Sequence, residues 1–164
     1  MIELYTDGAS SGNPGPGGYG TILRAVYQGS NAAYQGKLIE KEFLGGFRRT
    51  TNNRMELMAV IIGLEALKNL NQQVTVFSDS KYVIDAIDKK WVYGWIKKGF
   101  ESKKNKDLWL RLMNAYKLHQ VKLVWVKGHA GHPLNERCDQ LAVKASKDKV
   151  SWKIDSVSDM DEQK

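Results

Sequence analysis

The stretch NRMELMAVIIGLEALKNLNQQVTVFSD, residues 53–79, contains the change of hydrophobic period that decides the fold. Its first part predicts a helix over Asn53–Leu70, and Asn53 with Glu56 three residues later forms a capping-box pattern. The segment QVTVFS at 73–78 then predicts a strand that ends just before Asp79. Two strands joined by a helical crossover run parallel if they lie side by side.

Three strands are expected before this crossover, over Ile2–Asp7, Thr21–Tyr27 and about Leu38–Phe47. The segment between the second and third has turn residues and no helical period, so the three strands are predicted to form an antiparallel meander. The first strand is expected to end on Asp7, before the glycine-rich turn GASSGNPGPGGYG at 8–20. Those glycines suit a close approach of backbone to a ligand, with Asn13 able to reach a groove.

Beyond Asp79 the sequence predicts helices over Ser80–Lys90, Lys106–His119 and Pro133–Lys147, and a strand over 121–126. Hairpins followed by crossovers indicate an α/β domain, with a five-stranded mixed sheet flanked by helices. We expect one folded domain over residues 1–148. The polar, acidic residues 149–164 are predicted to be a disordered tail.

Composition suits one core-forming domain, since 42% of the 164 residues are hydrophobic and 26% are charged. A single cysteine, Cys138, excludes an internal disulfide and favours a reducing compartment. The longest apolar run, Leu57–Leu64, is too short to cross a bilayer, and no secretion signal opens the sequence. We therefore expect a cytoplasmic protein without a membrane partner.

The positive charge is concentrated in one segment. The net charge is +7, and residues 89–106 alone contain seven lysines and one glutamate, interleaved with Trp91, Tyr93, Trp95 and Phe100. Two interpretations stay open: a solvated helical face whose rings pack on the core, or a surface that binds nucleic acid through phosphates and stacked bases.

Four carboxylates are candidates for a shared site. Asp7 and Asp79 end strands that share one edge of the sheet, and Glu56 lies on an apolar helical stripe that faces the core. Asp139 flanks the buried seam of the last helix. Each has an ordinary alternative, such as a helix cap for Asp79 or a solvated surface position for Asp139. Together they would repel unless a divalent cation intervened, and an all-oxygen site suits Mg²⁺ or Mn²⁺.

Two histidines lie three residues apart in GHAGH, at His129 and His132. This spacing is compatible with zinc, but Cys138 alone does not complete a ligand set. A histidine that carries protons in the glycine-rich loop is the preferred interpretation.

Four segments in combination, TDGASSGNPGPGGYG (6–20), RRTTNNRMEL (48–57), FSDSKYV (77–83) and WVKGHAGHPLNERCDQLA (125–142), resemble the bacterial type 1 ribonuclease H family. The resemblance spans about residues 2–145. It implies the ribonuclease H fold and a catalytic domain. It also implies an endonuclease that cleaves the RNA strand of an RNA–DNA hybrid with two Mg²⁺ ions, or Mn²⁺, and leaves 5′-phosphate and 3′-hydroxyl ends.

The resemblance also implies site residues. The implied metal ligands are Asp7, Glu56, Asp79 and Asp139, and the implied mobile catalytic histidine is His129. The implied minor-groove contacts are Asn13, Asn52 and Asn53. The implied pocket for a DNA-strand phosphate consists of Arg49, Thr51 and Asn105. The implied channel and basic protrusion for the DNA strand consist of Tyr82, Trp91, Trp95, Lys97 and Lys98.

The sequence departs from the family pattern at three places. Lys81 stands where many relatives carry glutamine, which puts one minor-groove contact in question. The 27–37 stretch is longer than the usual hairpin, and the segment after Phe100 is shorter than usual. A DNA-cutting nuclease on the same fold and a non-catalytic hybrid-binding module are the alternative functions. We expect the protein to act as a monomer.

Overall fold

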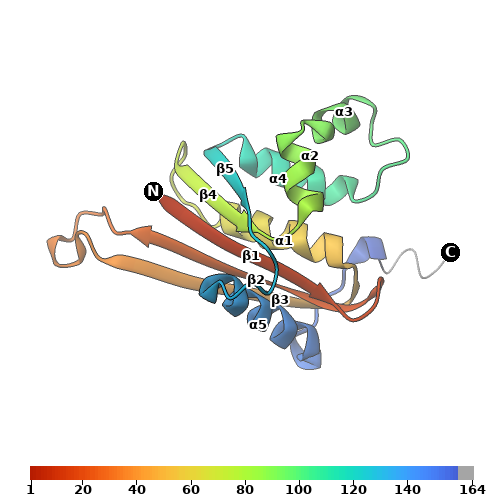
Figure 1. Cartoon of the computed structure of the whole chain (residues 1–164), viewed down its shortest axis with the longest axis horizontal. Coiled ribbons are helices and arrows are strands. Elements are labelled where there is room, and N and C mark those ends of the chain that lie inside the picture. Colours follow the sequence, from red (N-terminus) through yellow and green to blue (C-terminus); the bar gives the residue numbers. More distant parts are fainter. Residues whose placement is uncertain (159–164) are drawn as a thin grey trace.

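Five strands form one mixed sheet with the order β3-β2-β1-β4-β5 in the computed structural model, which describes residues 1–158 (Figure 1). The strands are β1 (Ile2–Ser10), β2 (Gly15–Val26), β3 (Leu38–Thr50), β4 (Gln73–Ser78) and β5 (Gln120–Trp125). The pairs β1–β2 and β2–β3 are antiparallel, whereas β4 runs parallel to both β1 and β5. This topology confirms the predicted meander and crossovers.

Helices cover both faces of the sheet, with α5 on one face and α1, α2 and α4 on the other (Figure 1). The helices are α1 (Asn52–Glu65), α2 (Lys81–Asp88), α3 (Trp91–Lys97), α4 (Lys106–Tyr116) and α5 (Pro133–Lys147), with 3₁₀ turns η1 (Ala32–Tyr34) and η2 (Lys149–Ser151). Successive residues of β1 serve the two cores: Leu4 packs on the α1 side and Tyr5 on the α5 side.

The first strand is longer than predicted. It continues past Asp7 to Ser10, because β2 pairs with it as far as Ser10 opposite Gly17. Its parallel pairing with β4, however, stops at Tyr5 opposite Phe77. Asp7 therefore lies within a strand, just beyond the part that is paired on both sides.

The glycine-rich stretch is only partly a turn, since Gly15–Gly20 already belongs to β2. A Cβ at Gly18 would collide with the backbone of α5 at Ala142, and one at Gly20 would collide with the carbonyl of Cys138. These glycines thus serve the close approach of α5 to the sheet. The interpretation that they admit a ligand is wrong for these two positions.

The caps of α1 and α2 correct two expectations. Thr51, rather than Asn53, caps α1, since its Oγ1 accepts a hydrogen bond from the Arg54 amide at 3.2 Å. The predicted capping box with Glu56 is therefore wrong. Ser80 caps α2 by accepting from the Val83 amide at 3.2 Å, so this role does not fall to Asp79.

The end of the chain differs from the predicted tail over residues 149–158. Lys153 bridges to Phe47 on β3, and Asp155 is buried in an ion pair with Arg54. This polar segment packs on the fold because the Asp155 carboxylate pairs with the buried Arg54 guanidinium. Amino-acid composition alone does not reveal such a pairing. The other residues of the predicted tail, 159–164, lie outside the described part of the chain.

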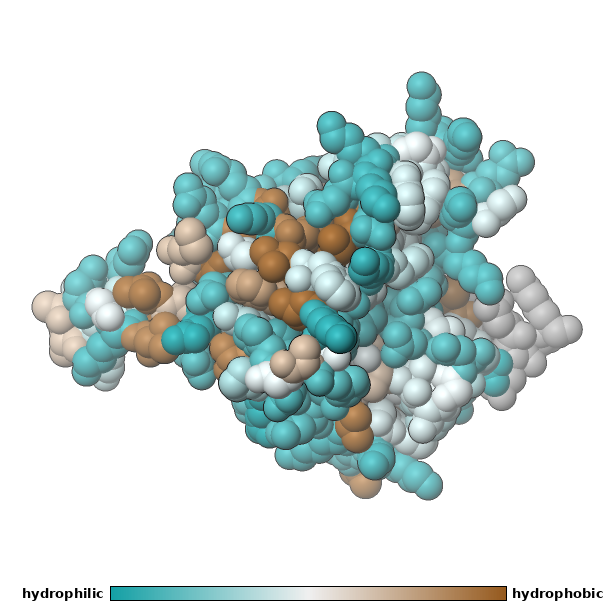
Figure 2. Space-filling model, in the orientation of Figure 1, coloured by the Kyte–Doolittle hydropathy of each residue, from teal (hydrophilic) through white to brown (hydrophobic). Residues whose placement is uncertain are grey.

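The extended β2–β3 hairpin projects beyond the N-terminal end of β1 (Figure 1). The Tyr27 and Tyr34 rings meet edge to face at its tip, with centroids 5.9 Å apart. Figure 2 shows apolar side chains on this arm, which include the exposed Val26 and Leu38. Within residues 1–158 none of the helices combines the length and apolar character that crossing a bilayer requires.

Replacing Gly20 by alanine should lower the free energy of unfolding by about 1–3 kcal/mol, because the new methyl group collides with the α5 backbone. Gly94→Ala is the control: Gly94 lies in α3, and a Cβ there meets nothing within 4 Å. Alanine also favours the helix, so this variant should be neutral or slightly stabilised. Urea unfolding compares the two, and equal effects would contradict this account of the packing.

Candidate active site

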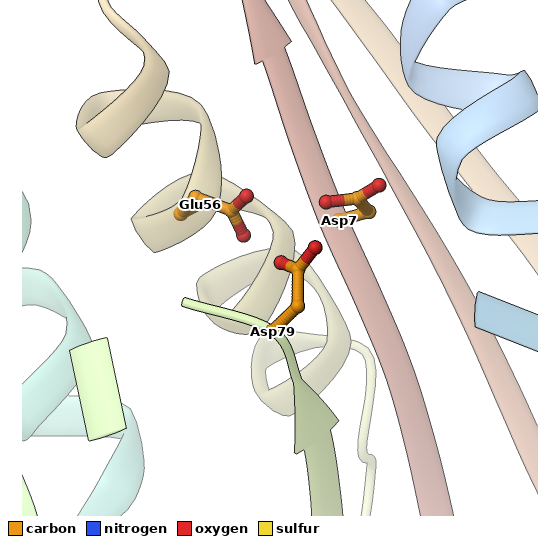
Figure 3. A group of neighbouring side chains, drawn as sticks. All are labelled: Asp7, Glu56 and Asp79. Atoms are coloured by element: carbon orange, nitrogen blue, oxygen red, sulfur yellow. The ribbon is translucent and has the colours of Figure 1, made fainter. Parts of the chain in front are cut away.

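Three carboxylates from three elements converge at one edge of the sheet (Figure 3). Asp7 comes from β1, Glu56 from the second turn of α1, and Asp79 from the residue after β4. Each offers an oxygen atom, and these oxygens all lie within 4.8 Å of one another. We call these three residues the carboxylate cluster.

Backbone packing brings the cluster together. A Cβ at Gly8 would collide with the Glu56 amide nitrogen and with Met55, so only glycine lets β1 and the start of α1 lie this close. The Gly8 amide donates a hydrogen bond to Asp7 Oδ1 at 2.9 Å. The parallel β1–β4 pairing then places Asp79 beside Asp7.

Burial and mutual repulsion favour the protonated forms of two of these acids. Burial, followed by the charge of Asp79, raises the pKa of Asp7 to about 7. Burial, followed by the charge of Asp7, raises the pKa of Glu56 well above its usual value. The buried Oε2 of Glu56 also has no hydrogen-bond partner among the described residues. An acidic, all-oxygen cluster with an unpaired buried acceptor fits a hard divalent cation.

Arg54, the nearest arginine in sequence, does not compensate this charge. Its guanidinium instead forms ion pairs with Asp107 and Asp155, both at 2.7 Å. The Glu56 and Arg54 side chains both begin near the N-terminus of α1, but Glu56 joins the carboxylate cluster and Arg54 pairs with Asp107 and Asp155.

Asp139 and His129 lie beside the cluster. Both line a small pocket together with Asp7 and Asp79, and the charge of Asp139 contributes to the raised pKa of Asp7. Asp139 is nevertheless outside the group whose oxygens lie within 4.8 Å. His129 is exposed in the loop between β5 and α5, with a left-handed φ of 55°.

The zinc alternative gains no geometric support. His132 packs against the rings of Tyr5 and Phe77, with centroids 5.5 and 6.3 Å away. Cys138 lies on the buried face of α5, and its thiol donates to the Tyr5 carbonyl at 3.1 Å. Among the described residues, the group able to hold a metal contains carboxylates only.

Six of the predicted substrate contacts line one cavity of about 660 Å³, which we call the α1 pocket. They are Asn13, Arg49, Thr51, Asn52, Asn53 and Asn105. Asn13 Oδ1 accepts a hydrogen bond from the Asn52 amide at 2.8 Å, which ties the glycine-rich turn to the start of α1. The sequence did not reveal that Val157 and Ser158 also line this pocket.

A second groove, of about 950 Å³, adjoins the α1 pocket through Asn53, Lys104 and Asn105, and we call it the tryptophan groove. Tyr82, Trp91, Trp95 and Lys98 line it, but Lys97 is not among its lining residues.

The aromatic rings of the basic segment differ in their burial. Trp95 packs on the core and also lies under the Lys103 ammonium, 5.3 Å from its ring centroid. Trp91 is 49% exposed. The Tyr82 hydroxyl accepts hydrogen bonds from Asn105 Nδ2 at 3.1 Å and from Trp109 Nε1 at 2.8 Å. This tyrosine therefore joins the groove to the α1 pocket.

Lys81 leans toward β5. Its Nζ lies 4.6 Å from the ring centroid of Trp125, whose Nε1 donates a hydrogen bond to the backbone carbonyl of Asp79 at 3.1 Å. Trp125 thus supports the segment that carries Asp79. Its place in the WVKGHAGH segment was the only signal in the sequence, and no role was predicted for it.

Without divalent cations, the free energy of unfolding should fall as pH rises from about 4 to 8. The raised pKa of Asp7 makes the folded state bind more protons than the unfolded state, and this stabilisation is lost as pH passes about 7. Asp7→Asn should reduce the loss by on the order of 2 kcal/mol. Urea unfolding of both proteins in EDTA at pH 5 and pH 8 measures the loss of unfolding free energy.

The exposed Asp148→Asn variant is the control for this titration, since Asp148 follows α5 away from the cluster. It should keep the pH dependence of the wild type. A wild type whose stability is the same at both pH values would contradict the assignment.

Comparison with known proteins agrees with this geometry. The profile of the RNase H family matches residues 1–147. The ribonuclease H of Desulforamulus reducens is 52% identical over 151 residues, which cover 89% of this chain and 87% of that relative.

Two solved structures share the fold. LC9-RNase H1, described as a type 1 RNase H with the type 2 active-site motif, is 31% identical with a TM-score of 0.74, over 88% of this chain and 71% of the other. LC11-RNase H1, solved in complex with an RNA/DNA hybrid, is 23% identical with a TM-score of 0.63, over 92% and 100% of the two chains. The family profile and the identity to curated relatives over most of both chains show that this protein belongs to the RNase H family of nucleases.

Proposed function

We propose that the protein is an endonuclease that hydrolyses the RNA strand of RNA–DNA hybrids by a two-metal mechanism, leaving 5′-phosphate and 3′-hydroxyl ends. One observation carries the proposal: Asp7, Glu56 and Asp79 present oxygens within 4.8 Å of one another at the sheet edge. Membership of the RNase H family supports the choice of substrate.

Asp7, Glu56 and Asp79, with Asp139 beside them, would hold two divalent cations, with Mg²⁺ as the expected metal and Mn²⁺ as the alternative. When bound, such a pair lowers the pKa of an attacking water and stabilises the leaving 3′-oxygen. Asp7 would be the best candidate for a ligand shared by both ions, since it lies on the central strand β1 with an oxygen within 4.8 Å of oxygens of both Glu56 and Asp79.

The side chains have distinct tasks in this mechanism. Asp7 and Glu56 hold protons while no cation is bound, which relieves the repulsion within the cluster, and release them on metal binding. His129, exposed on the loop that borders the same pocket, is proposed to carry a proton to or from the reacting phosphate.

The two cavities are proposed to hold the hybrid, with residues for both strands in the α1 pocket and residues for the DNA strand in the tryptophan groove. Asn13, Asn52 and Asn53 would sense the 2′-hydroxyls of RNA through the minor groove, which short polar side chains can reach. Arg49, Thr51 and Asn105 would bind one phosphate of the DNA strand, and the tryptophan groove with Lys97 and Lys98 would contact the following ones. Affinity would then fall steeply with salt. One chain supplies all these groups, which supports action as a monomer.

Asp7→Asn should lower the rate of hybrid cleavage on the order of 10³-fold or more, because it removes a charged ligand while keeping the shape of the side chain. Hybrid binding, measured in EDTA, should stay within about threefold of the wild type, since Asp7 lies outside both binding cavities. Cleavage of a labelled hybrid with and without Mg²⁺ or Mn²⁺ is the assay, and Asp148→Asn is the control.

Three outcomes would overturn the proposal. Binding without metal-dependent cleavage would indicate a binding module. Equal cleavage of a matched DNA duplex would indicate a DNA-cutting nuclease. Products with a 5′-hydroxyl end would contradict the proposed end chemistry.

Lys81→Gln should increase the preference for a hybrid over double-stranded RNA, if Lys81 loosens RNA selectivity at this position. The Lys81 ammonium lies over the Trp125 ring. A glutamine amide at this position would both donate and accept hydrogen bonds in the minor groove of the hybrid. The ratio of the two cleavage rates is the measurement. An unchanged ratio would remove Lys81 from the specificity determinants.

A further inference from the structure

We propose that the C-terminal segment 152–158 is a working part of the substrate site, which positions the residues of the α1 pocket that bind the DNA-strand phosphate. The proposal rests on the hybrid-binding function proposed above. It assigns a role to residues that the sequence marked only as a polar tail.

The segment is anchored by a buried charge. Asp155 is 6% exposed, and its two oxygens accept hydrogen bonds from Arg54 Nε at 2.7 Å and Nη2 at 3.0 Å. The hydroxyl of Thr50, a residue that is fully buried, donates to the same carboxylate at 2.6 Å. Backbone hydrogen bonds of Lys153 with Gly46 and Arg48 attach the segment to β3.

The anchored segment reaches the pocket directly. Val157 and Ser158 line the cavity, and the Ser158 carbonyl accepts a hydrogen bond from Arg49 Nε at 3.3 Å. Arg49 is the arginine proposed to bind phosphate. The segment therefore forms one wall of the pocket and contributes to the position of the Arg49 side chain.

A second connection runs through Arg54 itself. The guanidinium that binds Asp155 also donates from Nη1 to Asn105 Oδ1 at 3.3 Å, and Asn105 in turn donates to the Tyr82 hydroxyl. Asn105 has a left-handed φ of 66° and makes no side-chain cap for α4, so its side chain depends on such contacts. Asp155 thus holds the Arg54 guanidinium together with Asp107, which accepts from the same group at 2.7 and 2.9 Å, and Arg54 in turn orients a second proposed phosphate ligand.

Positioning and mere stabilisation of the fold differ in their kinetic effects. If Asp155 acts through Arg49 and Asn105, its loss weakens hybrid binding and leaves the carboxylate cluster intact. If it only stabilises the fold, KM and kcat of the folded variant stay unchanged. The KM-against-kcat split therefore separates the two roles.

Asp155→Asn should raise KM for the hybrid roughly three- to tenfold, as the loss of one charged hydrogen-bond partner would, with kcat within about twofold of the wild type. Thr50→Val, which keeps the shape of the buried side chain and removes the donor to Asp155, should raise KM in the same direction. In an Arg49→Ala, Asn105→Ala background, Asp155→Asn should have no further effect on KM.

Glu65→Gln is the matched control. Glu65 pairs with Arg111 at 2.6 Å and joins α1 to α4, as the Arg54–Asp107 pair does. Glu65 and Arg111 do not line the α1 pocket. Its KM should equal that of the wild type. All variants are compared below their unfolding midpoints, which circular dichroism determines.

Two results would overturn the inference: unchanged KM in the folded Asp155→Asn and Thr50→Val proteins, or an undiminished effect of Asp155→Asn in the double-alanine background. Hybrid cleavage by the wild type in the same assay tests the proposed function separately. An inactive wild type would refute that function, whereas an active wild type with unaffected variants would refute only this inference.

Discussion

Repulsion among three closely held carboxylates is the constraint on which the rest of the structure depends. Asp7 and Asp79 meet because the parallel β1–β4 pairing ends at Tyr5 and Phe77, and Glu56 joins them because Gly8 lets α1 approach β1. The folded chain thus holds three acidic side chains together that would lie apart in an unfolded chain. The free energy gained by burying apolar side chains on both faces of the sheet must offset that cost, and a bound cation would reduce it.

Helix α1 connects the carboxylate cluster to the α1 pocket. Its N-terminal region contributes Glu56 to the carboxylate cluster and Arg54 to the network behind the α1 pocket. Because both side chains project from one rigid helix, the separation between the cluster and the pocket is fixed by helical geometry. A nucleic acid bound in the pocket as proposed would therefore lie at a defined distance from the carboxylate cluster, without any movement of one element against another.

The sequence predicts what depends on local pattern, and misses what depends on distant partners. The bounds of β4 and α5 match the prediction, since a period of two and a proline at the helix start are local signals. The start of β2 was missed, because glycines carry no hydrophobic pattern. Asp155 was missed because its partner Arg54 lies 101 positions away. The convergence of Asp7, Glu56 and Asp79 could be expected from topology, whereas the place of Asp139 just outside their group could not.

The extended hairpin has a practical consequence. It leaves the sheet at the N-terminal end of β1, whereas the carboxylate cluster lies past the other end of the β1–β4 pairing. Ser30 near its tip is exposed, so a fluorophore or an affinity handle attached to a cysteine at this position would point into solvent. Surface immobilisation through this arm would leave the catalytic edge facing solution, which makes the molecule suited to single-molecule observation of its own turnover.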